Sequence, residues 1–200
     1  MISNIKSTFK DIAIDFHGHN DLGMATANSI SAVQGGVDSL SVTVNGVGER
    51  SGNAPLEEVV MALKYSLGVD CDIKTENFTN LSKMVSEYSG IIVSPNKPIV
   101  GKNIFKHESG IHCKGMIFDK NSYELFHPEE VGAKEEEFVI GKHTGSSTIK
   151  HLLKKNGITL EENYIKKLVE NVKLLSHKEK RVIQIDELLS MCEKLYCKLK

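Results

Sequence analysis

The sequence predicts an α/β fold that begins with two strand-helix units and continues into a mostly helical part. Two observations predict the first part. A short apolar run typical of buried strands occurs twice, and each run is followed by apolar residues at helical spacing. A third observation predicts the helical part: in the later half of the chain, apolar residues recur mainly at helical intervals. Alternating strands and helices build parallel sheets, in which functional residues collect at the carboxyl ends of the strands.

The first unit combines a strand over Ile12–Phe16 with a helix over Leu22–Val33. Asn20 or Asp21 is able to cap this helix, because short polar side chains accept hydrogen bonds from the free N–H groups of a first turn. The preceding segment, Ile2–Asp11, is compatible with the end of another helix. The carboxyl end of the first strand therefore lies at the residues that follow Phe16.

The second unit combines a strand over Leu40–Val44 with a helix over Pro55–Leu63, where proline suits the first turn. A further amphipathic helix is predicted over Asn77–Ser89. Its apolar stripe is expected to be core. The stripe consists of Leu81, Met84, Val85 and Tyr88.

A change of character at Ser94–Pro98 marks the expected boundary between two domains. Residues 1–93 would form the strand-helix part, and residues 94–200 a linker and a helical subdomain. Four helices are expected in the subdomain, over Gly110–Ile117, Ser146–Lys155, Glu161–Leu175 and Ile185–Leu199.

The composition suits a globular protein that does not bind nucleic acid. The 200 residues are 40% hydrophobic and 26% charged, and a net charge of −1 offers no basic surface. The four cysteines form no C-x-x-C pair, and neither a signal peptide nor an apolar run of membrane length occurs. We therefore expect a cytoplasmic protein with reduced thiols and no membrane contact.

His17-Gly18-His19 forms a chelating pair at the carboxyl end of the first strand. Alternate side chains of a strand face the same way, so the two histidines lie roughly 6–7 Å apart along the backbone and can converge on one ion. The tripeptide alone favours two exposed histidines, but its position favours a metal site. Asn53, after the glycine-rich turn Gly46–Gly52, supplies a third neutral ligand. Such a set suits Zn, Mn, Fe or Co and leaves positions open for substrate oxygens.

Five segments resemble the metal-dependent Claisen-type synthases that condense acetyl-CoA with a 2-oxo acid, namely the isopropylmalate, citramalate and homocitrate synthases. The matches occur in the same order as in that family, which makes coincidence a poor explanation. The segments are residues 17–23, 45–53, 105–112, 123–132 and 140–145. The resemblance implies that the two predicted strands are the seventh and eighth of a TIM barrel and that a helical subdomain lies over the active site.

The chain departs from the family in one respect. The family's first barrel strand carries an Arg followed by an acidic metal ligand, and no such motif occurs in this sequence. Two strand-helix units cannot close a barrel. We expect either a truncation or, as the preferred interpretation, a split enzyme in which a companion subunit carries the first six barrel strands.

The resemblance also implies roles for residues of the helical subdomain. His112 takes the position of a catalytic histidine that handles a proton, and Tyr123 that of its tyrosine partner. In relatives these residues come from the neighbouring protomer, so dimerisation through the subdomain is expected. His107 and Glu108 are candidates for contacts with substrate or coenzyme. A divalent metal (Mg, Mn, Zn or Co) would be held by His17, His19 and Asn53.

The motif wording is closest to the homocitrate synthases of nitrogen fixation. The expected reaction is therefore the condensation of acetyl-CoA with 2-oxoglutarate to homocitrate and CoA, for nitrogenase cofactor synthesis. Alternatives are an isopropylmalate, citramalate or Re-citrate synthase fragment. An alternative from another class is a non-catalytic barrel remnant that acts as an assembly partner, which the retained site residues disfavour.

Overall fold

The computed structural model describes residues 1–118, 124–134 and 137–197, without the side chains of residues 111, 112, 117, 118, 196 and 197. Its contacts divide the chain into two compact units. The first unit comprises residues 1–104 and 127–134. The second comprises residues 105–126 and 135–200, as far as these are described.

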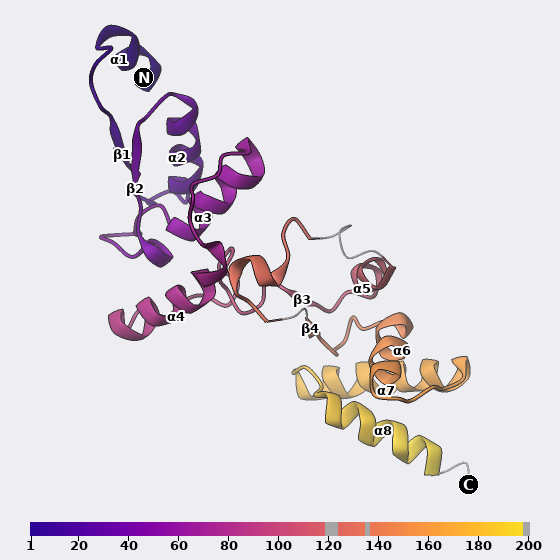
Figure 1. The fold of residues 1–200 in the computed structure, drawn as a ribbon. Helices are drawn as coiled ribbons and strands as arrows, with labels where there is room; N and C mark the ends of the chain where they lie inside the picture. The colour runs from indigo at the N-terminus through magenta and orange to yellow at the C-terminus, as the bar shows by residue number, and fades with distance from the viewer. Residues whose placement is uncertain (119–123, 135–136, 198–200) are drawn as a thin grey trace. The chain divides into compact units, whose positions relative to one another are not determined.

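The first unit begins with two strand-helix units, as the sequence predicts (Figure 1). Strands β1 and β2 are parallel, with Phe16 opposite Leu40 and His17 opposite Ser41. Both strands are shorter than expected, and the helix predicted to begin at Leu22 begins three residues later, at Ala25. The elements are α1 (Ile2–Thr8), β1 (Asp15–His17), α2 (Ala25–Gln34) and β2 (Ser39–Ser41).

A second group of helices follows β2. Pro55 directly precedes the first residue of α3 and takes the extended conformation of an N-cap. The helix α3 continues into one π-helical turn, η2, which ends at Gly68 in the left-handed conformation (φ 66°). The elements are the short turn η1 (Val44–Gly46), α3 (Leu56–Ala62), η2 (Leu63–Leu67), η3 (Thr75–Asn77) and α4 (Phe78–Ser89).

The core of the first unit lies between α2, α3 and the strand pair. Ala25, Ala54, Val59 and Leu63 are buried there, and Leu40 packs against them. Small residues at two of these positions let α2 approach the turn that precedes α3. The core therefore forms next to the carboxyl ends of β1 and β2.

The prediction that Leu81, Met84, Val85 and Tyr88 of α4 face the core is partly wrong. Met84 is 45% exposed and Tyr88 is 89% exposed, whereas Phe78 and Ser82 are buried. The physical reason is a polar contact: Asn45 in η1 hydrogen-bonds the backbone and the side chain of Ser82, and these bonds turn the Ser82 side of α4 inward.

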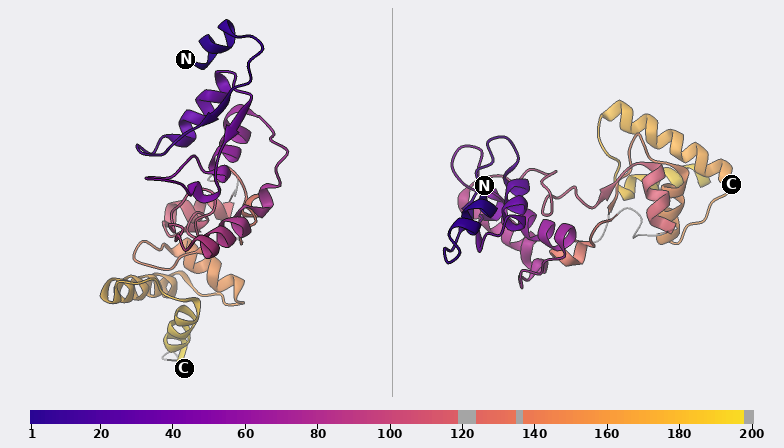
Figure 2. Two further views of the ribbon diagram at one scale, coloured as in Figure 1. Left: turned by 90° about the vertical axis from the view of Figure 1, so that its left-hand side faces the viewer. Right: turned by 90° about the horizontal axis from the view of Figure 1, so that it is seen from above.

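The second unit is mostly helical, and its four predicted helices are confirmed with small shifts of their ends. Its core contains Ile149 and Leu153 of α6, Leu168 of α7 and Leu188 of α8. The helix α7 contacts both α6 and α8 (Figures 1 and 2). A small parallel strand pair, β3–β4, was not predicted. The elements are β3 (Lys106–His107), α5 (Gly110–Phe118), β4 (Glu137–Phe138), α6 (Ser146–Lys155), α7 (Glu162–Glu179) and α8 (Ile185–Cys197).

The segment 127–134 packs with the first unit, although its neighbours in the sequence belong to the second. It contains the short helix η5 (Pro128–Val131). The helices of the described residues include none with the length and apolar character needed to cross a membrane.

Candidate metal centre

His17 and His19 lie at the carboxyl end of β1, and their ring centroids are 5.0 Å apart. Nδ1 of His17 lies 3.2 Å from the backbone carbonyl oxygen of Ser41 on the neighbouring strand. A proton on Nδ1 donates to this carbonyl and leaves the lone pair on Nε2, which is the arrangement of a metal-binding histidine. The strand pairing thus orients the first histidine.

The glycine-rich turn brings Asn53 next to His19. These two residues form an isolated antiparallel bridge. The backbone N–H of Ala54 donates to the oxygen of Gly18, and that of Asn20 donates to the oxygen of Gly52, at 3.0 and 2.9 Å. The loop that carries Asn53 is therefore held along the segment that carries His19.

Two glycines of this turn are required by its tight path. A side chain at Gly48 would lie 2.4 Å from Nδ2 of Asn53, and one at Gly52 would lie 2.2 Å from the oxygen of Gly46. Gly52 also has a positive φ of 85°, which other residues rarely adopt. The turn consequently wraps closely around the Asn53 side chain.

Two buried polar atoms at this site have no hydrogen-bond partner among the described residues. They are Nδ1 of His19 and Oδ1 of Asn53. Nδ2 of Asn53 donates to the oxygen of Val47 at 3.3 Å, which leaves its Oδ1 as the free acceptor. A neutral nitrogen and an amide oxygen without protein partners fit a divalent cation, because both are metal donors and both are costly to bury unpaired. The residues present therefore fit the metal that the sequence predicts.

The described residues contain no cluster of three or more His, Cys, Asp or Glu side chains able to hold a metal ion. The candidate centre therefore comprises the two imidazoles of His17 and His19 and the amide of Asn53.

An ion pair links the two loops of the centre. Arg50 donates from Nε and from its terminal nitrogen to the two carboxylate oxygens of Asp21, at 2.9 and 3.0 Å. This bond lowers the pKa of Asp21. The pair is half exposed and adds little stability. Its effect is geometric, because Asp21 follows His19 and Arg50 precedes Asn53. Arg50 thereby ties the glycine-rich turn to the loop that follows β1.

The second unit contains His107 and Glu108. Oε1 of Glu108 accepts the backbone N–H of His143 at 3.0 Å, and a side chain at Gly141 would collide with this carboxylate. Nε2 of His107 lies 3.8 Å from Oε1 of Glu124, and both side chains are largely buried. The two candidates thus have partners within their own unit, and their role toward substrate stays a prediction.

The two candidate catalytic residues cannot be placed to the same extent. His112 belongs to α5, but its side chain lies outside the described part of the structure, as does the whole of Tyr123. Next to His112, Cys113 is fully buried, and burial raises the pKa of its thiol. Cys113 is therefore a packed thiol rather than an exposed nucleophile.

Sequence reasoning missed a buried acidic residue close to the centre. Glu57 is 2% exposed and accepts the backbone N–H of Asn45 at 3.1 Å. Its signal in the sequence was a carboxylate within the run Pro55–Leu63, whose other residues are mostly apolar. An acidic residue in the first turn of a helix usually remains exposed, so the pattern alone did not single it out.

Two family models match separate parts of the chain. Residues 1–85 match the family model described as HMGL-like, and residues 99–180 match the one described as homocitrate synthase post-HMGL domain-like.

Similar proteins carry the names of three related synthases. Homocitrate synthase 1 of Nostoc sp. is 46% identical over 90% of this chain and 48% of its own length. A 2-isopropylmalate synthase of Caldanaerobacter subterraneus is 44% identical over 99% of the chain and 51% of its own length. A protein of Methanopyrus kandleri named as an (R)-citramalate synthase is 46% identical over 88% of the chain and 35% of its own length.

The chain thus spans about a third to a half of the length of the curated relatives it matches. Residues 1–85 and 99–180 are thus similar to an HMGL-like domain and to a homocitrate synthase post-HMGL domain, and the similar proteins are named as homocitrate, isopropylmalate and citramalate synthases.

Proposed function

We propose that this chain supplies part of the active site of a metal-dependent acyltransferase that condenses acetyl-CoA with a 2-oxo acid. The observation that carries the proposal is the pair of buried, unpartnered donors, Nδ1 of His19 and Oδ1 of Asn53, beside His17. They lie where the related enzymes are expected to hold a metal, at the carboxyl ends of parallel strands.

His17, His19 and Asn53 would hold the cation, and an acidic residue from the missing part of the barrel would complete the ligand set. A divalent ion in this position supplies Lewis acidity that polarises the keto group of the 2-oxo acid. The three ligands from this chain are neutral, so with one acidic ligand part of the charge of the ion would remain for the substrate's carboxylate and keto oxygens.

His112 and Tyr123 would handle the proton of the reaction. Loss of a proton from the acetyl-CoA methyl group gives an enolate whose carbon forms a bond to the keto carbon, and the resulting alkoxide takes up a proton. Water then hydrolyses the thioester and releases CoA. A histidine near neutral pH can exchange such a proton. His107 and Glu108 are proposed to contact substrate or coenzyme.

We propose 2-oxoglutarate as the 2-oxo acid and homocitrate as the product, in the synthesis of the nitrogenase cofactor in the cytoplasm. Support comes from the motif wording and from the similarity to the homocitrate synthase of Nostoc sp.. Relatives named for isopropylmalate and citramalate are similarly close, so the choice rests on the motifs. The alternatives are 2-oxoisovalerate, pyruvate and oxaloacetate.

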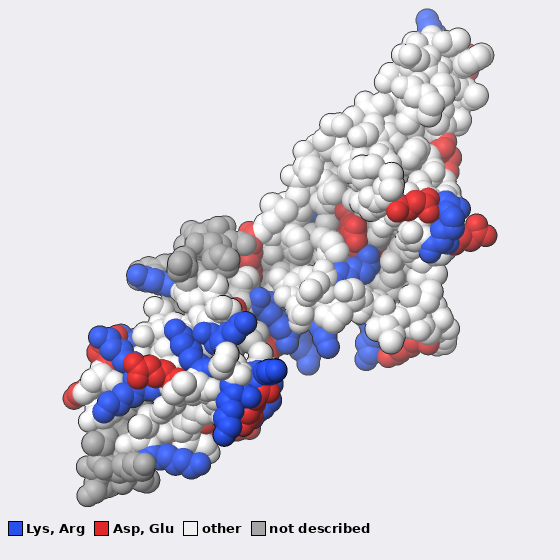
Figure 3. Space-filling view, turned by 180° about the vertical axis from the view of Figure 1, so that it is seen from behind, with Lys and Arg blue, Asp and Glu red and all other residues white. Residues whose placement is uncertain are grey.

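We also propose that six further strand-helix units, carried by a companion subunit, complete the barrel, and that the helical subdomain forms a dimer contact. The support is the open state of the strand pair. In β1 and β2, Phe16 and Leu40 are half-buried and the other four residues are exposed, whereas parallel strands in a closed barrel are covered on both faces. In Figure 3, charged side chains gather on the second unit, and most of the visible face of the first unit carries uncharged residues.

A substrate comparison with the complete enzyme tests the proposal. The chain and its companion are co-purified with a divalent metal, and CoA release from acetyl-CoA is measured with each of the four 2-oxo acids. We expect the highest kcat/KM with 2-oxoglutarate. With a His17→Ala chain we expect no CoA release from any of the four acids. A preference for another acid would correct the substrate, and metal-loaded complex without CoA release from any acid would support the non-catalytic alternative.

A further inference from the structure

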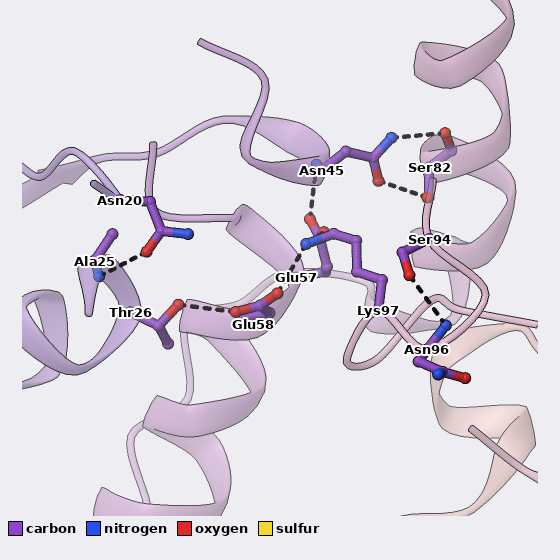
Figure 4. A network of polar contacts seen from close by, with 10 residues as sticks. All are labelled: Asn20, Ala25, Thr26, Asn45, Glu57, Glu58, Ser82, Ser94, Asn96 and Lys97. Carbon is purple, nitrogen blue, oxygen red and sulfur yellow. Dashed lines mark hydrogen bonds and ion pairs between the residues drawn. The ribbon is translucent and has the colours of Figure 1, made fainter. Parts of the chain in front are cut away.

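The loop that carries Asn53 begins at a residue in an uncommon backbone conformation. Asn45 has a positive φ of 60°, and its N–H donates to Oε2 of Glu57 at 3.1 Å. Its side chain is held as well, because Nδ2 donates to the oxygen of Ser82 and Oδ1 accepts from the Ser82 hydroxyl (Figure 4). Asn45 is thus fixed from α3 and from α4 at the same time.

The start of the loop is connected to Asn53 by a short path. Asn45 is followed by Gly46, whose oxygen accepts the N–H of Asn53 at 2.9 Å. A side chain at Gly46 would lie 2.9 Å from the backbone oxygen of Asn53, so the two ends of the loop are in contact. A shift at Asn45 therefore moves the backbone of Asn53.

The acceptor of the Asn45 N–H is a buried carboxylate with a distant counter-ion. Glu57 is 2% exposed, and its burial raises the pKa of the carboxyl. Lys97 lies 52 positions after Asn45 in the Ser94–Pro98 segment, and its Nζ is 3.4 Å from Oε1 of Glu57 and 2.8 Å from Oε1 of Glu58. The other oxygen of Glu58 accepts from the hydroxyl of Thr26 in α2.

Without Lys97, Glu57 would be a buried charge without compensation, which is strongly unfavourable. The lysine side chain is only 14% exposed, so solvent screens this interaction weakly. Lys97 acts to lower the pKa of Glu57 against the effect of burial. The carboxylate has one oxygen near Lys97 and the other at the Asn45 N–H.

We propose that Glu57 and Lys97 are positioning residues that set the place of the Asn53 side chain in the metal centre, and so its metal affinity. The inference rests on the proposed metal centre and extends it. It assigns to the Ser94–Pro98 segment a part in the centre that its position in the sequence does not indicate.

The test uses the full chain co-purified with its companion, and Mn²⁺ alone as the ligand, with free Mn²⁺ measured by electron paramagnetic resonance. Glu57→Gln and Lys97→Met should each weaken Mn²⁺ binding by roughly 10-fold, the effect usual for residues that orient ligands. The Asn53 side-chain amide signals in the NMR spectrum of the metal-free chain should move in both variants. The matched control is Lys102→Met, because Lys102 is an exposed lysine five residues after Lys97. This variant should change neither the Mn²⁺ affinity nor the Asn53 signals.

The double variant Glu57→Gln/Lys97→Met separates positioning from packing. With the lysine removed, the single carbonyl oxygen of the glutamine is available to the Asn45 N–H, so the double variant should recover most of the affinity lost in either single variant. It also decides the question if Lys97→Met alone does not fold.

Two results would overturn the inference: wild-type affinity and unmoved Asn53 signals in folded Lys97→Met, or a double variant no better than the single ones. The proposed metal centre is tested separately by His17→Ala. If His17→Ala binds Mn²⁺ as wild type does, the metal centre is refuted, whereas the movement of the Asn53 signals still decides whether Glu57 and Lys97 position the loop.

Discussion

At the scale of single residues, the candidate centre is defined by donors without hydrogen bonds. Leaving Nδ1 of His19 and Oδ1 of Asn53 buried and unpaired costs roughly 1–3 kcal/mol for each group. A cation that binds both atoms removes this cost. The metal and the local fold of the loop are therefore expected to stabilise each other.

Replacing His17 or His19 by alanine should remove metal binding and activity together, because a centre with so few protein ligands cannot lose one. The measurement is metal content by mass spectrometry in the co-purified complex, with CoA release measured on the same samples. His177→Ala is the control, since this histidine is exposed on α7 and should retain both properties. A full equivalent of metal in both His17→Ala and His19→Ala would show that the pair is structural.

Changing His112 to alanine should lower kcat by roughly 100-fold or more while the metal content stays unchanged, because a proton-transfer group acts in the transition state. Tyr123→Phe should have a smaller effect in the same direction. Steady-state kinetics and metal analysis of the same preparations are the measurements. Release of metal by either variant, or a kcat near wild type, would contradict the assignment of these residues as catalytic.

At the scale of elements, the carboxylate of Glu130 connects η5 to η2. Glu130 accepts hydrogen bonds from Lys64 and Tyr65 of η2, at 2.8 Å and 2.7–2.8 Å, and from the backbone N–H of His127. Burial acts to raise the pKa of Glu130, but these three donors outweigh it and hold the pKa at about 2. Burial, together with the contact to Glu130, raises the pKa of Tyr65 to about 12.

Replacing Glu130 by glutamine should lower the free energy of unfolding by roughly 2 kcal/mol at neutral pH, the scale of hydrogen bonds to a charged group. The pKa of Glu130 is lower in the folded chain than its ordinary value of 4.5, so this stabilisation is complete above about pH 4.5 and is lost as the pH falls toward 2. Denaturant unfolding followed by circular dichroism at several pH values measures the difference between the variants.

The control for this prediction is Glu129→Gln, which changes an exposed neighbour in the same short helix. It should leave stability nearly unchanged at every pH. A difference between wild type and Glu130→Gln that stays constant from pH 6 to pH 3 would mean that the charge of Glu130 does not fasten η5.

At the scale of the whole molecule, the strand pair of the first unit leaves apolar surface exposed. Phe9 is 59%, Leu22 82% and Met24 50% exposed, all near β1 or α2 in the sequence. Apolar side chains around an open parallel strand pair suit further strand-helix units packed against them. This surface is the physical basis for the proposed companion subunit.

The isolated chain should therefore show no condensing activity and should be weakly stable or self-associated until the companion is present. Co-expression with the companion should restore a monodisperse complex and CoA release from acetyl-CoA and 2-oxoglutarate. Size-exclusion chromatography with light scattering, and the activity assay, are the measurements. A normal rate with the purified chain alone would refute the split barrel.

Features that depend on local periodicity were determined by the sequence itself. The helix predicted over Ser146–Lys155 is observed with these bounds, and the order of the two strand-helix units is confirmed. The proximity of His17 and His19 was also predictable from their spacing, and the structure places their ring centroids 5.0 Å apart. Helix ends were less certain, since α2 starts at Ala25, where the Asn20 side chain accepts its N–H.

Only the tertiary structure decided the features that join residues far apart in the chain. The partner of Arg50 is Asp21, 29 residues away, and the counter-ion of buried Glu57 is Lys97. Asn45 turned Ser82 inward on α4 and left Tyr88 exposed. A single sequence carries no record of which charges approach each other or which helix face a hydrogen bond selects, because these choices depend on how distant segments pack.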